Sequence, residues 1–238
     1  MNEKFFSAEA WENAWHVIQK EFPTAILETL TMTLLATAIA VLIGIPLGVL
    51  LAAGDKNGVL PLPGWLYRFL NVLIDLLRSV PFLILMIMVF PLSRLIIGTT
   101  VGTAATVVPL AVAAFPFVAR LAEGSLRELD PNLTEAAESM GATPLQIVTK
   151  VMIPESLPSL LSDITITLTT VLGYSAMSGI IGGGGLGNIA ITYGYYRYQY
   201  LTMLFAVVVL VAIVGVFQFG GTYLASRLDR RLKKKKRT

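Results

Sequence analysis

The sequence predicts an all-α membrane protein with five transmembrane helices. Of its 238 residues, 55% are hydrophobic and 14% are charged, whereas a soluble domain carries about 25% charged residues. The charges are segregated, because 25 of the 33 charged side chains fall in residues 1–28, 120–155 and 227–238. The rest of the chain holds uncharged runs of 25 to 33 residues, and a helix needs roughly 20 apolar residues to cross the bilayer. This pattern excludes an ordinary cytosolic enzyme and a disordered chain.

The five predicted spans cover residues 27–53, 68–92, 101–123, 157–182 and 201–225. The second span contains Asp75 and Arg78, which are three residues apart and share a helix face. We therefore expect these two side chains to form an ion pair near its cytoplasmic end. Pro91 is expected to kink or end the same helix, because proline lacks the N–H that an α-helix requires.

Residues 1–26 precede the predicted transmembrane domain, which covers 27–226. They hold four Glu and two Lys and lack a small-residue cleavage site, which is untypical of a signal peptide. Apolar residues recur there at i, i+4, i+7 and i+11, namely Trp11, Trp15, Ile18 and Phe22. With Ser7 as N-cap, the segment is predicted as an amphipathic helix. It either lies on the outer membrane surface or packs against a neighbouring helix.

The distribution of Lys and Arg predicts which side of the membrane each segment faces. With the C-terminus inside, cytoplasmic segments hold 14 basic residues and outer segments hold four. Basic residues mark the cytoplasmic side, so the N-terminus is expected outside and the C-terminus in the cytoplasm. The basic tail, 227–238, is then a cytoplasmic segment that binds the anionic lipid of the inner leaflet.

The cytoplasmic loop over residues 124–155 is predicted to form a helix–turn–helix. Asp130 is a suitable N-cap, and the helix over 132–140 is expected to end at Gly141. Thr143 then caps a second helix, where Gln146 completes a capping box. A nucleic-acid partner is excluded, because residues 120–155 hold six acids and three bases and nucleic-acid contact needs a basic face.

The same loop carries a recognisable motif. Glu135-Ala136-Ala137, Gly141 and Val151-Met152-Ile153-Pro154 have the spacing of the EAA loop, and the chain resembles the permeases of binding-protein-dependent ABC importers. The resemblance implies that Glu135, Ala136, Ala137 and Gly141 form coupling helices that dock in a cleft of an ATPase subunit. Small alanines permit close docking, and Glu135 lies near a helix N-terminus, where the helix dipole favours a carboxylate. The alternative is that Glu135 is a solvated surface acid.

Six further stretches are similar to the methionine importer permease subfamily: 77–82, 98–102, 114–120, 140–144, 173–177 and 182–188. This resemblance implies a type I ABC importer in the bacterial cytoplasmic (inner) membrane. Such an importer consists of two copies of this chain, two ATP-binding cassette subunits and an extracytoplasmic methionine-binding protein. ATP and Mg²⁺ would bind to the partner ATPase, and this chain would carry no cofactor, metal or catalytic residue.

The fourth span is the predicted lining of the transport path, because it is rich in Ser and Thr. Ser175, Ser178 and Gly179 fall at i, i+3 and i+4 and share a face. Met177 lies just off this face, and its flexible thioether suits a gate between two symmetry-related copies. Two alternatives remain, namely a Met177 that is buried by packing and hydroxyls that bond back to their own helix.

Two further features lie on the predicted outer side. The glycine-rich run 182–187 lacks the Lys-Ser/Thr of a phosphate loop, so it is predicted as a close-packed turn that ends the fourth span. Five tyrosines follow before the last span: Tyr193, Tyr195, Tyr196, Tyr198 and Tyr200. They fit an interfacial aromatic belt or a contact with the binding protein.

The predicted function is therefore that of a permease subunit for methionine, driven by ATP bound to separate subunits. One alternative is a permease for another small solute, such as a polar amino acid or a quaternary amine. An ion-coupled carrier would be expected to show inverted repeats and intramembrane ionisable groups. An intramembrane enzyme would need a nucleophile–base or metal constellation, and the chain has no cysteine.

Overall fold

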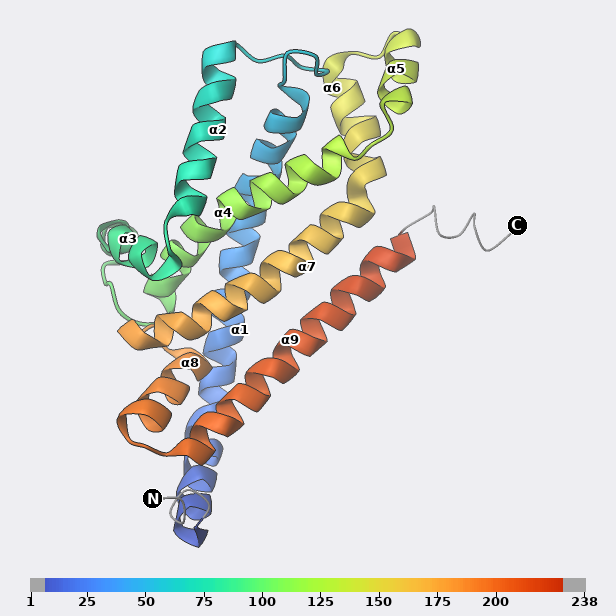
Figure 1. Ribbon diagram of the computed structural model, residues 1–238. Coiled ribbons are helices and arrows are strands. Elements are labelled where there is room, and N and C mark those ends of the chain that lie inside the picture. The colour runs from blue at the N-terminus through green and yellow to red at the C-terminus, as the bar shows by residue number, and fades with distance from the viewer. Residues whose placement is uncertain (1–6, 229–238) are drawn as a thin grey trace. The chain divides into compact units, whose positions relative to one another are not determined.

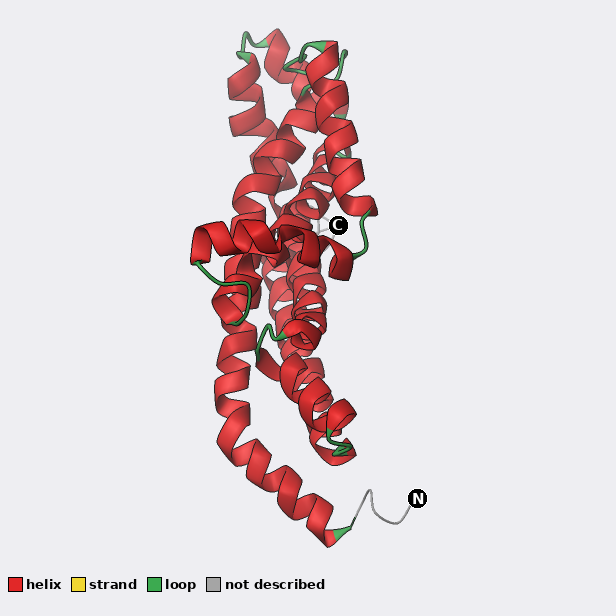
Figure 2. Ribbon diagram, turned by 90° about the vertical axis from the view of Figure 1, so that its left-hand side faces the viewer, coloured by secondary structure: helices red, strands yellow, loops and turns green. Residues whose placement is uncertain are grey.

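The computed structural model describes residues 7–228, and this part of the chain is helical with short connections and no strand (Figures 1 and 2). It forms two compact units. Within the described residues, unit 1 comprises 7–37, 81–112 and 168–217, and unit 2 comprises 38–80, 113–167 and 218–228. The basic tail from Arg230 to Arg237, for which we predict membrane binding, lies outside the described residues.

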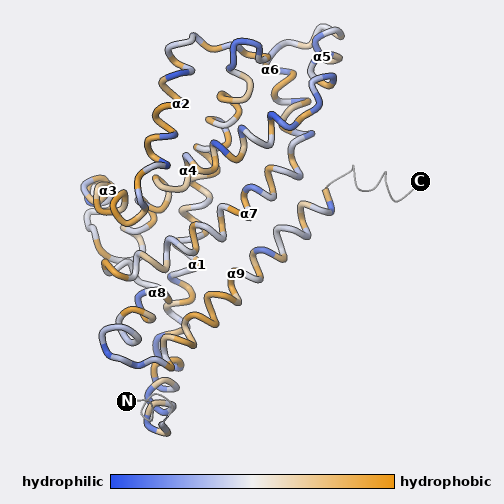
Figure 3. The backbone as a smooth tube through the Cα atoms, in the orientation of Figure 1, coloured by the Kyte–Doolittle hydropathy of each residue, from blue (hydrophilic) through white to orange (hydrophobic). Residues whose placement is uncertain are grey.

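Four helical stretches in the described part are each long and apolar enough to cross a membrane. They are α1 (Ala8–Ala53), α4 (Thr103–Arg127), Pro144–Ile181 and α9 (Tyr200–Leu228). The helices α2 (Gly64–Ser79) and α3 (Phe82–Ile97) pass the same test only when taken together. The count is thus four, or five if this pair is one broken span. Hydrophobic residues dominate α9, whereas hydrophilic residues gather around the α5 label (Figure 3).

The second predicted span is broken at a different proline from the one expected. Val80 and Pro81 both have extended backbone, with ψ of 126° and 136°, and they separate α2 from α3. Pro81 disfavours the helical conformation of the residue before it, which ends α2. Pro91 lies inside α3, which continues to Ile97, so the expectation that the helix ends at Pro91 was wrong, and a kink there stays a prediction.

The N-terminal segment is continuous with the first span, because α1 runs unbroken from Ala8 to Ala53. Ser7 caps it as predicted, with its hydroxyl accepting from the Ala10 N–H at 3.2 Å. Among the α1 residues buried in unit 1, Val17, Phe22 and Ala25 pack against Leu186, Ile189 and Ala206. Trp15 is 60% exposed. The contacts of this segment therefore favour packing against a neighbouring helix, with a buried stripe rotated from the predicted one.

In unit 2, α1 and α4 approach closely at two glycines. A Cβ added at Gly44 would overlap Val118, and one at Gly48 would overlap the carbonyl oxygen of Ala119. Glycines spaced by four residues form a groove that lets two helix backbones meet, as is common in membrane proteins. This contact places the C-terminal end of α4 beside that of α1.

The loop after α4 folds largely as predicted. Helix α5 (Pro131–Ser139) is capped by Asp130, whose carboxylate accepts from the Asn132 N–H at 3.0 Å. Gly141 ends the turn with φ of +80°. Helix α6 (Pro144–Ile147) follows, and the Gln146 side chain accepts from the Thr143 N–H at 2.9 Å.

Helix α6 leads into the fourth span through a widened turn. A π-helical segment, Val148–Met152, joins α6 to α7 (Ile153–Ser178). Pro154 has no N–H to donate, and a π turn accommodates the missing bond. The helix of the fourth span consequently begins before the expected residue 157, and a 3₁₀ turn over Gly179–Ile181 closes it.

Candidate functional site: the 124–155 loop and the glycine-rich turn

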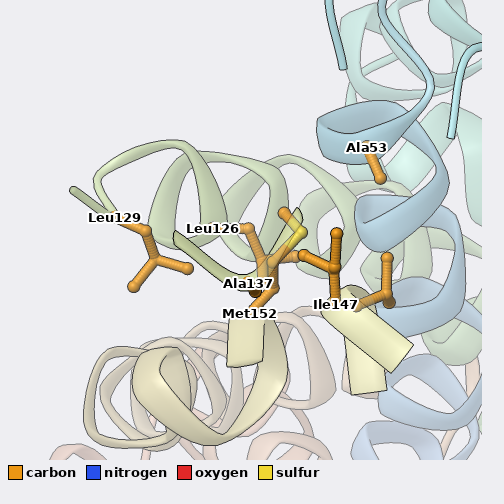
Figure 4. Packing of buried hydrophobic residues seen from close by; sticks show 7 residues of the cluster. Ala53, Leu126, Leu129, Ala137, Ile147 and Met152 are labelled. Carbon is orange, nitrogen blue, oxygen red and sulfur yellow. The ribbon is translucent and has the colours of Figure 1, made fainter. Parts of the chain in front are cut away.

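The loop over residues 124–155 belongs to unit 2, and one of its sides is apolar and packs against the rest of this unit. Ala137 is 4% exposed and belongs to a buried cluster in which it lies near Leu126 and Met152 (Figure 4). The other members of this cluster are Ala53, Leu129, Ile147 and Val148. Ala53 is the last residue of α1, so the loop rests on the ends of both α1 and α4.

The opposite side of the loop is exposed and more apolar than predicted. Glu135, Ala136 and Gly141 are exposed, so they are available to a partner, whereas Ala137 is not. Met140 is 82% exposed and Leu145 is 66% exposed. The sequence analysis did not select these two residues. Their position beside the turn, among polar neighbours, was the available signal, since exposed apolar groups mark interaction surfaces.

Gly141 is required because of its backbone conformation and not because neighbouring atoms leave no room for a side chain. Its φ of +80° lies in the left-handed region, and nothing lies within 4 Å of a Cβ placed there. Glycine adopts this conformation without the steric penalty that other residues pay. The turn that presents Met140 therefore depends on this residue.

A cluster of charged side chains lies in unit 2 near the C-terminal end of α4. Glu123 of α4 is 7% exposed and contacts two arginines of its own helix, Arg120 at 2.6 Å and Arg127 at 3.1 Å. Arg120 also forms an ion pair with Asp75 at 2.8 Å. The prediction of an ion pair between Asp75 and Arg78 was wrong, because Asp75 pairs with Arg120 of another helix.

The predicted lining face of α7 is buried within unit 1. Ser175 and Ser178 are 1% and 0% exposed, and their hydroxyls donate to the carbonyls of Leu172 and Ser175. Gly179 lies against the backbone of Gly187 and Asn188. These three residues share a face as expected, but it packs against the turn that follows. Met177 is 42% exposed, so it is not the buried packing residue of the alternative.

The glycine-rich run forms the predicted turn and is fixed to α1. Gly184 and Gly185 have φ of +81° and +74°. The N–H of Gly185 donates to the Glu28 carboxylate at 2.7 Å, and the N–H of Leu186 donates to the Thr29 hydroxyl at 2.9 Å. The short helix α8 (Gly185–Ile189) starts at this point. The run thus serves close packing within unit 1.

The tyrosines divide into one that is tied down and others that are exposed. Tyr193 donates a hydrogen bond to Glu21, and this bond raises the pKa of its phenol. Arg197 lies over the Tyr193 ring at 4.5 Å. Tyr195, Tyr196 and Tyr198 are 68%, 61% and 75% exposed, respectively. Beside them, a groove of about 490 Å³ is lined by the start of α1 and residues 197–201.

Nothing in the described part of the chain suggests a metal centre. Over residues 7–228, no group of three or more His, Asp or Glu side chains lies close enough to hold a metal ion. The described part of the chain instead presents three exposed features: one side of the 124–155 loop, one side of α7, and the tyrosines Tyr195, Tyr196 and Tyr198.

The chain is similar to known transport proteins. The chain is 50% identical over 209 residues to a "Probable D-methionine transport system permease protein MetI" of Vibrio cholerae, covering 87% of this chain and 92% of that protein. A protein of the same name from Pasteurella multocida is 50% identical over 205 residues, covering 86% and 94% of the two chains. A chain of the "MetNI methionine ABC transporter", solved in inward-facing conformations, matches with a TM-score of 0.87 at 41% identity. That match covers 90% of this chain and 98% of the solved one.

The family assignment rests on most of the chain. The family model described as "Binding-protein-dependent transport system inner membrane component" matches residues 44–234, which include the cytoplasmic loop, the charge cluster and all of α7. The chain belongs to this family of binding-protein-dependent transport system inner membrane components.

Proposed function

We propose that this chain is the permease subunit of an ATP-driven importer for methionine in a bacterial inner membrane. The observation that carries the proposal is the cytoplasmic loop, which is anchored through Ala137 and exposes Glu135, Ala136, Met140 and Leu145. An exposed apolar surface of this kind fits a protein partner. The relatives named for D-methionine transport support the substrate.

The exposed side of the loop would dock on separate ATPase subunits, which would bind ATP and Mg²⁺. Met140 and Leu145 supply apolar contact area, and the small Ala136 lets the partner approach α5 closely. Glu135 supplies a carboxylate for a donor on the ATPase. Nucleotide binding on the partner would then shift the permease between inward-facing and outward-facing states by binding one of them more tightly.

The transport path would form between two copies of this chain. With Ser175, Ser178 and Gly179 buried, the lining is assigned to exposed positions of unit 1, namely Gly173 and Met177 of α7 and Ile180 of the 3₁₀ turn that follows it. A two-fold axis would bring the same exposed face of both copies together. Met177 would then close the path against its equivalent in the second copy, because a thioether side chain adapts to irregular contacts.

The arrangement in the membrane is five spans, with α2 and α3 together forming the second one. The excess of basic residues in the predicted inner segments supports an N-terminus outside and a C-terminus inside. In this arrangement residues 1–26 form the outer N-terminal segment, 27–226 the permease domain and 227–238 a cytoplasmic tail. The exposed tyrosines then lie outside, at the side from which a methionine-binding protein delivers its ligand.

The direct test is transport by the purified assembly. The chain is co-purified with the ATPase subunits that associate with it, reconstituted in vesicles and supplied with the binding protein. We expect labelled methionine to accumulate only when ATP is present on the ATPase side. Accumulation of a polar amino acid or a quaternary amine, and not of methionine, would show that this other solute is the substrate. Accumulation driven by a proton or sodium gradient without ATP would contradict the proposal.

A further inference from the structure

The charge cluster of unit 2 joins three helix segments through one buried carboxylate. Glu123 lies in α4 between Arg120, three residues before it, and Arg127, four residues after it, so all three side chains share a helix face. The Glu123 side chain is 10% exposed, and each of its two oxygens accepts from a different arginine. Glu123 is therefore the link between the two guanidinium groups.

Each arginine extends from Glu123 to a different element. Arg120 reaches α2, where it donates to the Asp75 carboxylate at 2.8 Å and to the Asn71 carbonyl at 3.3 Å. This side chain is 19% exposed. Arg120 consequently holds the middle of α2 to α4 through both a charge and a backbone carbonyl.

Arg127 reaches the end of α1 and the first turns of α2. It donates to the Leu51 carbonyl at 3.3 Å and to the Tyr67 hydroxyl at 3.0 Å, and it lies 3.6 Å from the Asp55 carboxylate. Arg127 is also the last residue of α4. The final turn of α4 is thus tied to α1 and α2 through one side chain.

The same helix ends carry the cytoplasmic loop. Leu126, which precedes Arg127, packs with Ala53 of α1 and with Ala137 of α5 in the buried cluster. Leu51, whose carbonyl Arg127 binds, packs with Ile74 of α2. A displacement of α5 is therefore passed to a turn whose position is set by Arg127 and, through Glu123, by Arg120.

Stability alone is a weak explanation for this arrangement. The Glu123 carboxylate and the Arg120 guanidinium are largely removed from water, which is costly for charged groups, and apolar residues of similar volume often stabilise a protein as well or better. What a multidentate cluster provides beyond packing is fixed geometry, because each guanidinium donates in defined directions. Such a cluster can preserve the relative positions of α1, α2 and α4 while the loop is displaced.

We infer that Glu123 is a positioning residue for coupling: it transmits movement of the cytoplasmic loop to α2 by holding Arg120 and Arg127 together. This inference rests on the proposed function, because it assumes that an ATPase moves the loop. Loss of the link should leave ATP hydrolysis intact and separate it from transport. A residue that only stabilised the fold would lower both activities in proportion.

The test compares Glu123→Gln with Glu128→Gln in the complete importer. Glutamine keeps the shape of Glu123 but lacks the charge that holds two arginines, and Glu128 is an exposed acid next to the same helix end. Methionine uptake and ATP hydrolysis are measured in the same vesicles. We expect Glu123→Gln to lower the number of methionines moved per ATP by about fivefold or more. This is the lower end of the change that coupling between two sites typically produces. Glu128→Gln should keep the ratio of the unmodified importer.

A second variant covers the case in which Glu123→Gln does not assemble. Arg120→Lys keeps the positive charge, but one ammonium group cannot reach Glu123, Asp75 and the Asn71 carbonyl in the directions that the guanidinium uses. It should lower the same ratio. An unchanged ratio in an assembled Glu123→Gln importer would overturn the inference, and so would failure of both variants to assemble, since Glu123 would then act in folding. Failure of the unmodified importer to take up methionine would contradict the proposed function instead.

Discussion

Ala136 and Ala137 are adjacent in α5, yet one is exposed and the other is buried. Ala137 is 4% exposed inside the cluster that anchors the cytoplasmic loop, whereas Ala136 is exposed beside Glu135. Ala137 thus packs the loop against the ends of α1 and α4. Under the proposed function, Ala136 would instead leave room for the ATPase to approach.

Replacing these alanines should separate anchoring from docking. Ala137→Leu inserts volume into a filled cluster, so we expect a loss of about 1–3 kcal/mol in stability and a lower thermal unfolding temperature in detergent. Ala136→Leu should leave that temperature unchanged and weaken association with the ATPase, measured by co-purification. Equal unfolding temperatures for the two variants would contradict the assignment of Ala137 to the core.

Gly141→Ala tests the backbone conformation of the loop. A left-handed conformation costs a non-glycine residue roughly 1–2 kcal/mol, and no side-chain overlap is added because the space around Gly141 is open. We expect a reduced yield of the assembled importer and reduced uptake. Gly124→Ala is the matched control, since Gly124 has equally open surroundings and a helical backbone. A similar effect of both substitutions would show that φ at Gly141 is not the cause.

Glu28→Ala tests the bond that fixes the glycine-rich turn to α1. The N–H of Gly185 would lose its acceptor, and an unpaired buried donor costs about 1–3 kcal/mol. The thermal unfolding temperature should fall for Glu28→Ala and change little for Glu12→Ala, which removes an exposed acid from the same helix. Glu28→Gln keeps an acceptor oxygen and should restore most of the loss. If Glu28→Gln did not restore the unfolding temperature, an acceptor oxygen alone would not be enough and the negative charge of Glu28 would be required.

Cysteine substitution in this cysteine-free chain tests which side of α7 lines the path. Water-soluble thiol reagents should label Gly173→Cys and Met177→Cys in an outward-facing importer, because these positions are exposed. Ser175→Cys and Ser178→Cys should stay unlabelled, because both sites are buried. Met177→Cys should also crosslink to its equivalent in the closed state. The reverse labelling pattern would return the lining to the serine face.

Several features that depend only on neighbouring residues were predicted from the sequence. The caps at Asp130 and Gln146, the left-handed Gly141 and the glycine turn after α7 are local, and each was found where predicted. The break at Val80 was also local, since proline restricts the residue before it. The prediction named only Pro91 as an interruption of this span and overlooked Pro81.

The remaining errors concern partners that are distant in the chain. Spacing placed Arg78 on the same face as Asp75, but it could not show that Arg120, 45 residues away, would reach that carboxylate. Likewise, helical spacing put Ser175 and Ser178 on one face without indicating whether that face would meet solvent or the following turn. Periodicity identifies faces, and only tertiary packing decides which face is buried.

The central claim is that the exposed side of the cytoplasmic loop docks on an ATPase and couples it to transport. The measurement that tests it most directly is the amount of ATPase recovered with the Glu135→Arg chain, together with ATP-dependent methionine uptake. Reversing a charge at a docked carboxylate costs about 2–5 kcal/mol, so both should be lost while the chain remains in the membrane. Glu128→Arg, outside α5, should retain both. Normal ATPase recovery and uptake with Glu135→Arg would contradict the account.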